Sequence, residues 1–358
     1  MIELPSGKLG LCLSGGGSKG AYGVGVIQYL FEVLQRRDIG IIYGTSTGSL
    51  IASMLGLSIA TSDPSYVTEL IHIYKNVLDA DILKPHHEIA YAVGGEMGVL
   101  AATLVAGGSS IFDTKPLGDL IDRYMTPDNW KKLINAGKRK KNPIEVGFCI
   151  ADIQSGDSYI VSNISHPKPS VLRDALLASA SQPVFMPTTK INDVAPNHQF
   201  VDGGLVEYTP VEKIFESPLQ DKLDAVLSIA MDPLQHNPST KEYTSTTDIL
   251  LRTLSLFVDG VYFNDMKVAT LWNLILKIKS ILPAPEWQTI ENHLPPPIQE
   301  FVKNKLTNRK YLPIYYFNPS SPLDINSLKF EQDKMRKLIR QGFKDAMSGI
   351  KNENITVV

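Results

Sequence analysis

The chain reads Tyr43-Gly44-Thr45-Ser46-Thr47-Gly48 between an apolar run at residues 39–42 and a run of small and apolar residues at 49–57. A strand, a tight turn and a helix in this order predict a nucleophile elbow, with the Ser46 hydroxyl exposed at the turn. Gly44 and Gly48 suit the elbow because a side chain there would collide with the neighbouring strand or helix. The N-terminus of the following helix supplies partial positive charge where an oxyanion would form. The alternative is an ordinary turn rich in glycine, serine and threonine.

A second glycine-rich turn precedes the elbow. Residues 9–13 predict a short strand, the chain then reads Ser14-Gly15-Gly16-Gly17-Ser18-Lys19-Gly20, and apolar residues at helical spacing predict a helix over 21–37. Gly15, Gly17 and Gly20 also match the pattern of a dinucleotide-binding loop. Such loops need an acidic residue at the end of the next strand, whereas Asp38 comes before that strand. A nucleotide-binding protein is therefore the second hypothesis.

The two turns would form one site if their strands are parallel neighbours, because ligands bind at the carboxyl ends of strands in open α/β sheets. Glycine amides beside a helix N-terminus form a concave anion site. The amides of Gly15, Gly16 and Gly17 would then stabilise the oxyanion of a tetrahedral intermediate on Ser46. The positive charge of Lys19 lies near a helix N-terminus, where the helix dipole disfavours it. We therefore expect Lys19 either to tie the loop by hydrogen bonds to carbonyl groups or to meet an anionic group. The alternative is a solvated surface lysine.

A third turn reads Phe200-Val201-Asp202-Gly203-Gly204. It predicts a strand that ends in an acid, and two glycines without side chains would let Asp202 lie close to another loop. Taken alone, Asp-Gly is typical of an Asx turn. Taken with the elbow and the glycine loop, it indicates a third part of the same site.

With these motifs in view, residues Leu9 to about Pro233 resemble the patatin-like phospholipase family. The resemblance rests on the three turns and on the small-residue run from Ala178 to Pro187, all in the order typical of the family. It implies hydrolysis of lipid acyl esters by a serine–aspartate dyad without histidine. By position, Ser46 is the nucleophile, Asp202 the base and Gly15 to Gly17 the oxyanion loop. The supporting motif positions are Lys19, Gly20, Gly44, Gly48, Gly203 and Gly204.

Three departures from the family pattern leave the substrate preference open. Ser14, Lys19 and Thr47 stand where many members have aspartate, arginine and alanine. None of these departures removes a catalytic group.

A dyad requires an unusual aspartate. A free aspartate has a pKa of about 3.9 and is a poor base for a hydroxyl, so Asp202 must be positioned tightly and partly desolvated. The competing scheme is a Ser–Asp–His triad in which the histidine comes last in the chain. His236 and His293 both follow Asp202, so the order of residues is compatible with either scheme.

The predicted fold is a three-layer α/β sandwich, with a central, mostly parallel sheet and helices on both faces. Residues 1–235 are expected to form the catalytic core and 236–358 a mostly helical extension with a late strand, packed on the same domain. Residues 248–282 predict a long helix whose apolar stripe places Trp272 either on the core or in a lipid surface. Pro283 to Pro297 predicts a proline-broken connection. Residues 94–108 predict either a buried helix or a mobile lid with glycine hinges.

Composition limits the partners. The 358 residues carry a formal net charge of -2, which argues against a strongly electrostatic nucleic-acid partner. Cys12 and Cys149 lie in apolar runs and predict buried thiols. Without a signal peptide or membrane span, the expected location is cytoplasmic, with peripheral membrane contact left open. The expected substrate is a phospholipid or another acyl-ester lipid, and neither a metal nor an organic cofactor is expected. The basic stretch Lys131 to Lys141 predicts a solvated loop or a contact with anionic membrane.

Overall fold

The computed structural model describes residues 6–88, 91, 94–95, 98–100, 102–103, 107–234, 242–244, 246–349 and 355–357. Within these residues, nine strands form one sheet in the order β11-β10-β9-β1-β2-β5-β8-β7, and β6 pairs with β5 off this path. The five neighbouring strands β10, β9, β1, β2 and β5 run parallel. The bounds are β1 Leu9–Leu13, β2 Ile39–Thr45, β5 Glu145–Asp152, β6 Ser158–Ser162, β7 Thr189–Lys190, β8 Gln199–Asp202, β9 Ala225–Ile229, β10 Ile314–Phe317 and β11 Ile355–Val357.

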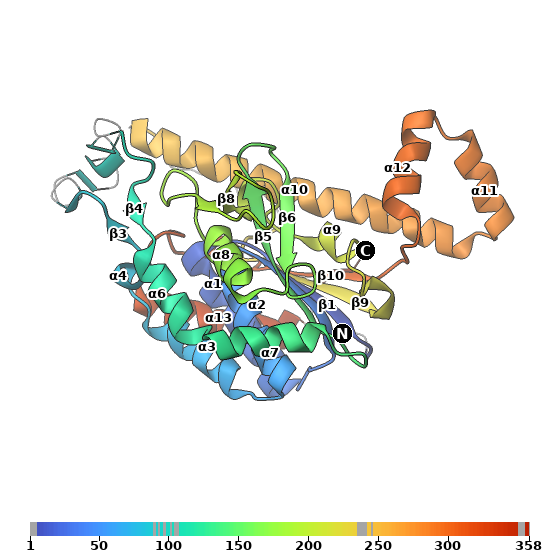
Figure 1. Cartoon of the computed structure of the whole chain (residues 1–358), viewed down its shortest axis with the longest axis horizontal. Coiled ribbons are helices and arrows are strands. Elements are labelled where there is room, and N and C mark those ends of the chain that lie inside the picture. Colours follow the sequence, from blue (N-terminus) through green and yellow to red (C-terminus); the bar gives the residue numbers. More distant parts are fainter. Residues whose placement is uncertain are drawn as a thin grey trace.

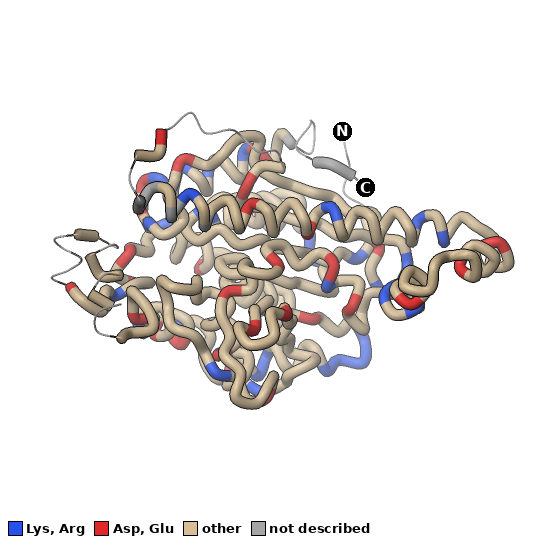
Figure 2. Tube along the Cα trace, turned by 90° about the horizontal axis from the view of Figure 1, so that it is seen from above, with Lys and Arg blue, Asp and Glu red and all other residues tan. Residues whose placement is uncertain are grey.

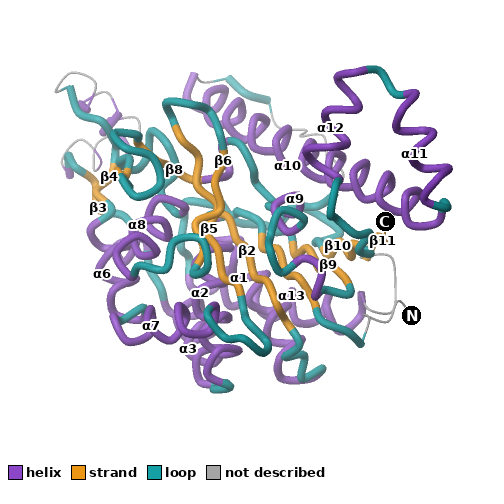
Figure 3. The backbone as a smooth tube through the Cα atoms, turned by 45° about the vertical axis from the view of Figure 1, so that its right-hand side comes forward, coloured by secondary structure: helices purple, strands orange, loops and turns teal. Residues whose placement is uncertain are grey.

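Helices cover both faces of the sheet, which confirms the predicted fold class (Figure 1). In Figure 3 the strands run between two sets of helices. One set comprises α1 (Gly20–Gln28), α2 (Thr47–Thr61), α3 (Ser65–Asn76), α6 (Lys115–Tyr124), α7 (Pro127–Gly137), α8 (Pro169–Ser179) and α13 (Gln332–Gly349). The other comprises α9 (Val211–Ile214), the long α10 (Thr246–Ile281) and α12 (Pro296–Leu306).

The alternation of side chains along the strands explains the two cores. In β1, Leu11 and Leu13 belong to the core under α1 and α2, whereas Cys12 belongs to the core under α10. Successive residues of a strand point to opposite faces, so an apolar strand with no polar position must be covered on both sides. Cys12 and Cys149 are free thiols and are fully buried, as their apolar surroundings predicted.

The residues after 235 continue the same sheet. Strand β10 pairs in parallel with β9, and helix α13 packs against α1. We therefore propose that residues 236–358 are an extension of the 1–235 core and not a unit with a separate sheet.

One expectation for this extension was wrong. Residues 283–297 were predicted as a broken connection, yet they contain the helix α11 (Ala284–His293). Its proline lies in the first turn, where a missing N–H costs no helical hydrogen bond. Of the two alternatives for Trp272, the structure shows packing on the core and not placement in lipid: the residue is only 6% exposed and its ring packs edge-on against Phe301, with ring centroids 5.3 Å apart.

Several expectations fall on residues outside the described ranges. Residues 96–97, 101 and 104–106 of the proposed lid at 94–108, together with His236, belong to this group. In the described part of the chain, no helix combines the length and apolar character needed to cross a membrane. Figure 2 shows acidic and basic positions mixed along the trace, without a large face of one sign.

Candidate active site

Ser46 and Asp202 are brought together by the way β2, β5 and β8 pair. Strand β2 pairs with β5 up to Thr45 opposite Cys149, and β8 pairs with the next part of β5, with Asp202 opposite Ile150. Strand β6 pairs with residues 147–151 and so occupies the other edge of β5. Strands β2 and β8 therefore share one edge of β5 and run toward each other. The residue that follows β2 and the last residue of β8 must meet there.

The backbone at Ser46 is the predicted elbow. The backbone of Ser46 has φ 57° and ψ −126°. Residues other than glycine rarely adopt this conformation, which costs on the order of 1–3 kcal/mol. A Cβ on Gly44 would lie 2.3 Å from the carbonyl carbon of Gly48, and a Cβ on Gly48 would lie 2.3 Å from the Leu13 carbonyl oxygen. A side chain fits at neither position, so both positions require glycine, as the sequence predicted.

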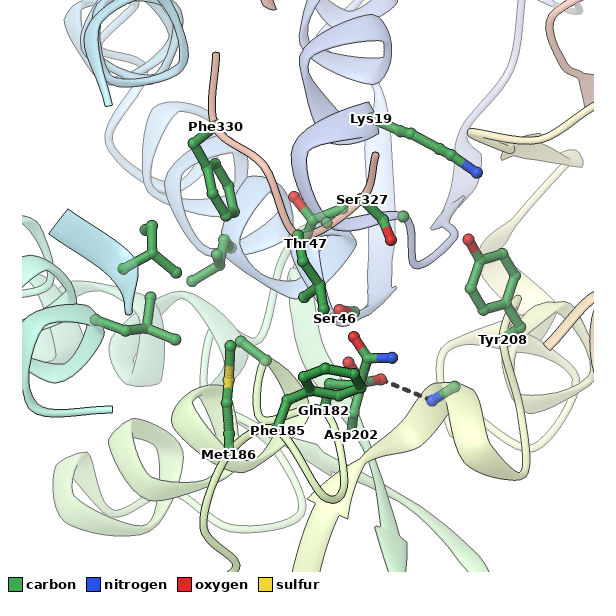
Figure 4. A pocket seen from close by; sticks show the side chains of 18 of the residues that line it. Lys19, Ser46, Thr47, Gln182, Phe185, Met186, Asp202, Tyr208, Ser327 and Phe330 are labelled. Carbon is green, nitrogen blue, oxygen red and sulfur yellow. Dashed lines mark hydrogen bonds between the residues drawn. The ribbon is translucent and has the colours of Figure 1, made fainter. Parts of the chain in front are cut away.

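Asp202 is a buried carboxylate that faces Ser46. Its Oδ1 accepts a hydrogen bond of 2.8 Å from the Gly204 N–H, drawn as a dashed line in Figure 4. Burial raises the pKa of Asp202 to about 6, and the side-chain hydrogen bond with Ser46 and the Gly204 amide act in the opposite direction. The carboxylate is thus mostly ionised at neutral pH, and it is a stronger base than a free aspartate. Gly203 lets this turn pass close to β5, because a Cβ there would lie 2.6 Å from the Cys149 carbonyl oxygen.

The glycine loop differs from expectation at one position. The Gly15 N–H donates to the Tyr208 carbonyl at 3.1 Å, so the expectation that Gly15 is an oxyanion donor was wrong. In the described part of the chain, the amides of Gly16 and Gly17 make no backbone hydrogen bond. Both glycines line the same cavity as Ser46 and Asp202. Gly16 directly precedes the helical turn that leads into α1 at Gly20, and Gly17 is the first residue of that turn. The backbone N–H groups at the start of a helical segment favour a bound anion.

Lys19 ties the glycine loop to a carboxylate. Its Nζ lies 2.6 Å from Oδ1 of Asp232, and Oδ2 of Asp232 accepts a hydrogen bond of 2.8 Å from the Tyr208 hydroxyl. The anionic group that Lys19 meets is therefore a side chain of this chain. Neither Tyr208 nor Asp232 was singled out by sequence analysis, because each is a lone polar residue without a motif.

The cavity beside Ser46 has a volume of about 760 Å³ and walls that are largely apolar. Apolar side chains such as Phe185, Met186 and Phe330 lie on one side of Ser46 in Figure 4, and Lys19 and Tyr208 lie on the other. The apolar walls come from α2, α3, α6 and the loop after α8. Their residues include Leu50, Met54, Leu70, Ile73, Tyr74, Leu117, Ile121, Tyr124, Met125, Phe185 and Met186.

Among the described histidines, none lines this cavity. His293 is exposed on α11, where its Nδ1 lies 2.7 Å from the Thr289 carbonyl oxygen. His198, which precedes β8, pairs instead with Asp152. Of the two histidines considered for a triad, His293 therefore lies outside the site and His236 lies outside the described residues.

Comparisons with known proteins agree with the motifs. A family model described as "Patatin-like phospholipase" matches residues 11–214. "Uncharacterized protein L620" of Acanthamoeba polyphaga mimivirus is 24% identical over 231 residues, which cover 56% of this chain and 61% of that protein. The chain thus spans less than two thirds of the length of that relative. The crystal structure of VipD from Legionella pneumophila aligns with a TM-score of 0.40 and 12% identity, over 99% of this chain and 68% of VipD.

Proposed function

This chain belongs to the patatin-like phospholipase family, and from that premise we propose that it is a serine lipid acyl hydrolase using Ser46 and Asp202. The observation that carries the proposal is the meeting of an elbow serine and a buried carboxylate at one cavity. Beside them lie the amides of Gly16 and Gly17, which make no backbone hydrogen bond within the described residues. The reaction class is carboxylic ester hydrolysis of the phospholipase A, lysophospholipase or esterase type.

The reaction proceeds in two halves. Asp202 accepts the proton of the Ser46 hydroxyl as Oγ attacks the ester carbonyl carbon, and the amides of Gly16 and Gly17 stabilise the oxyanion. Collapse of the intermediate breaks the ester bond, and the leaving alcohol takes the proton from Asp202. Water then attacks the acyl-enzyme while Asp202 accepts a proton from it. The second collapse frees the fatty acid and returns that proton to Ser46.

The walls of the cavity support a lipid acyl chain as the occupant. Leu50 and Met54 line the cavity from α2, the helix that begins directly after Ser46. Met54 lies eight residues after Ser46, which corresponds to about 12 Å along the helix. An acyl group on Ser46 would therefore extend along this apolar wall, away from water.

The rim of the cavity supports contact with a lipid surface. Val184, Leu205 and Phe257 come from three separate segments, all line the cavity, and are 51%, 53% and 68% exposed. Val184 also has φ 72°, which is a strained conformation for a β-branched residue. Three exposed apolar side chains around an acyl-binding cavity would bury their surface in the bilayer that presents the substrate. The exposed basic residues 138–141 precede β5 and lie at the opposite end of the sheet from Ser46, so we assign them no part in this contact.

The decisive experiment measures labelling by a fluorophosphonate together with hydrolysis of a p-nitrophenyl ester and a phospholipid. We expect wild type to be labelled and active, Ser46→Ala to lose labelling and activity, and Asp202→Asn to lose activity. His236→Ala and His293→Ala should retain near-full activity. Labelling that persists in folded Ser46→Ala would refute Ser46 as the nucleophile. Inactivity of folded His236→Ala would replace the dyad with a triad.

A further inference from the structure

The Tyr208 ring lies beside the glycine loop and beside Gly204 of the Asp202 turn, the two segments that would surround the reacting ester. The Tyr208 carbonyl accepts the Gly15 N–H at 3.1 Å, and the Tyr208 hydroxyl donates to Oδ2 of Asp232 at 2.8 Å. The other oxygen of Asp232 lies 2.6 Å from Nζ of Lys19, which belongs to the helical turn that Gly17 begins. Tyr208 itself follows the turn of Asp202, Gly203 and Gly204 in the chain. In Figure 4, the Tyr208 hydroxyl and the Lys19 ammonium point to the same side of the cavity.

Tyr208 is buried, and both its backbone and its ring are held by neighbouring residues. The backbone N–H of Tyr208 donates at 2.7 Å to Oδ2 of Asp265, a residue of α10. A Cβ on Gly15 would lie 2.6 Å from the Tyr208 ring, so the ring lies directly against the glycine loop. The ring also packs edge-on against Tyr262, with centroids 5.8 Å apart. Burial and the nearby Asp232 carboxylate raise the pKa of Tyr208, so its hydroxyl keeps its proton and remains a donor.

We propose that Tyr208 is a positioning residue for hydrolysis, and that the Tyr208–Asp232–Lys19 chain fixes the amides of Gly16 and Gly17 relative to Ser46. This inference rests on the proposed function and adds how the oxyanion donors are held. The Lys19 N–H donates to the Gly16 carbonyl at 3.0 Å, so movement of Lys19 would turn the peptide units of the loop. Oxyanion donors act only within about 2.7–3.1 Å of the developing charge, so a small displacement lowers the rate.

The test is Tyr208→Phe, which removes only the hydroxyl and keeps the ring and the backbone contacts. We expect kcat for a soluble p-nitrophenyl ester to fall about tenfold with KM changed less than twofold, because the amides act mainly on the transition state. The rate of fluorophosphonate labelling should fall in parallel. Tyr316→Phe is the matched control, because Tyr316 is a buried tyrosine of β10 that does not line the cavity, and its kcat should stay within twofold of wild type.

A double-mutant cycle separates positioning from a general loss of packing. Lys19→Met should lower kcat, and Tyr208→Phe added to it should cost much less than in wild type, since both act through Asp232. Lys19→Arg should restore most of the kcat because it keeps the charge.

An unchanged kcat in Tyr208→Phe, or fully additive effects in the cycle, would overturn this inference while wild-type activity leaves the proposed function standing. A wild type without activity or labelling would instead refute the proposed function itself.

Discussion

The Ser179 hydroxyl accepts a hydrogen bond of 3.1 Å from the N–H of Ser46, and it donates one of 2.6 Å to the Cys149 carbonyl. Ser179 is the last residue of α8, so a helix packed on the sheet holds the strained residue of the elbow in place. The bond also occupies the Ser46 N–H, so this amide is not among the oxyanion donors that we propose, which are the amides of Gly16 and Gly17.

Ser179→Ala should destabilise the protein and slow the reaction of Ser46. The variant leaves the partly buried Ser46 N–H without its partner, which costs about 1–3 kcal/mol. Denaturant unfolding measures this change, and fluorophosphonate labelling measures the reactivity. Ser348→Ala is the control, because its hydroxyl bonds the Lys344 carbonyl on an exposed part of α13 and its loss should cost less than about 0.5 kcal/mol. Equal stability of the two variants would contradict a supporting role for Ser179.

The activity should depend on pH through Asp202. The base must be ionised, and burial raises its pKa to about 6. The value of kcat/KM for a soluble ester should therefore be constant above that pH and fall about tenfold for each unit below it. A pH profile between 4 and 9 measures the midpoint. A midpoint near 4 would show that Asp202 is not the titrating base. If a histidine were the base instead, its alanine variant would lose this pH dependence.

The Asp202→Asn variant should be inactive, yet it should be more stable than wild type at pH 8. The folded pKa of about 6 lies above the ordinary value of 3.8, so ionisation of Asp202 disfavours the folded state. This penalty is absent below pH 3.8, grows as the pH rises toward 6 and is complete above it, where it reaches about 3 kcal/mol. The free energy of unfolding of Asp202→Asn should exceed that of wild type by up to this amount at pH 8 and match it near pH 4. A gain that does not change with pH would contradict this explanation.

Met54→Trp should shorten the acyl chain that the enzyme accepts. The larger side chain would fill the wall about 12 Å from Ser46, so kcat/KM for p-nitrophenyl palmitate should fall at least tenfold relative to p-nitrophenyl butyrate. Met54→Ala is the matched variant and should keep or increase the preference for palmitate. An equal loss on both esters in Met54→Trp would indicate a general disturbance of α2 and no acyl wall at this position.

Phe257→Asp should weaken binding to a lipid surface. Binding of Ser46→Ala to phosphatidylcholine vesicles, measured by flotation, avoids turnover of the lipid. Adding Phe257→Asp should reduce binding about tenfold or more, because an exposed apolar anchor becomes a charge. Leu271→Asp is the matched control, since Leu271 is 57% exposed on the same helix but does not line the cavity. Binding that Leu271→Asp reduces and Phe257→Asp leaves intact would move the contact to another face.

Local sequence patterns were sufficient for the elements around the site. The length of the apolar runs predicted β1 and β2, and turn chemistry placed Ser46, Asp202 and the glycines at strand ends. The need for glycine at position 44 also follows from the turn alone, because a Cβ there would meet Gly48. These features depend on residues that are close together in the chain, so one sequence is enough to predict them.

Only the tertiary structure decided which polar groups of distant segments form hydrogen bonds and ion pairs with one another. The Gly15 amide is bonded by Tyr208, Lys19 is paired with Asp232, and the Ser46 amide is held by Ser179, although each pair is separated by more than a hundred residues. No periodicity or motif encodes such a pair, because any buried acceptor at the right place would serve. The sequence by itself thus determined which residues stand at the strand ends, and the packing of the sheet determined which of their groups remain free to act.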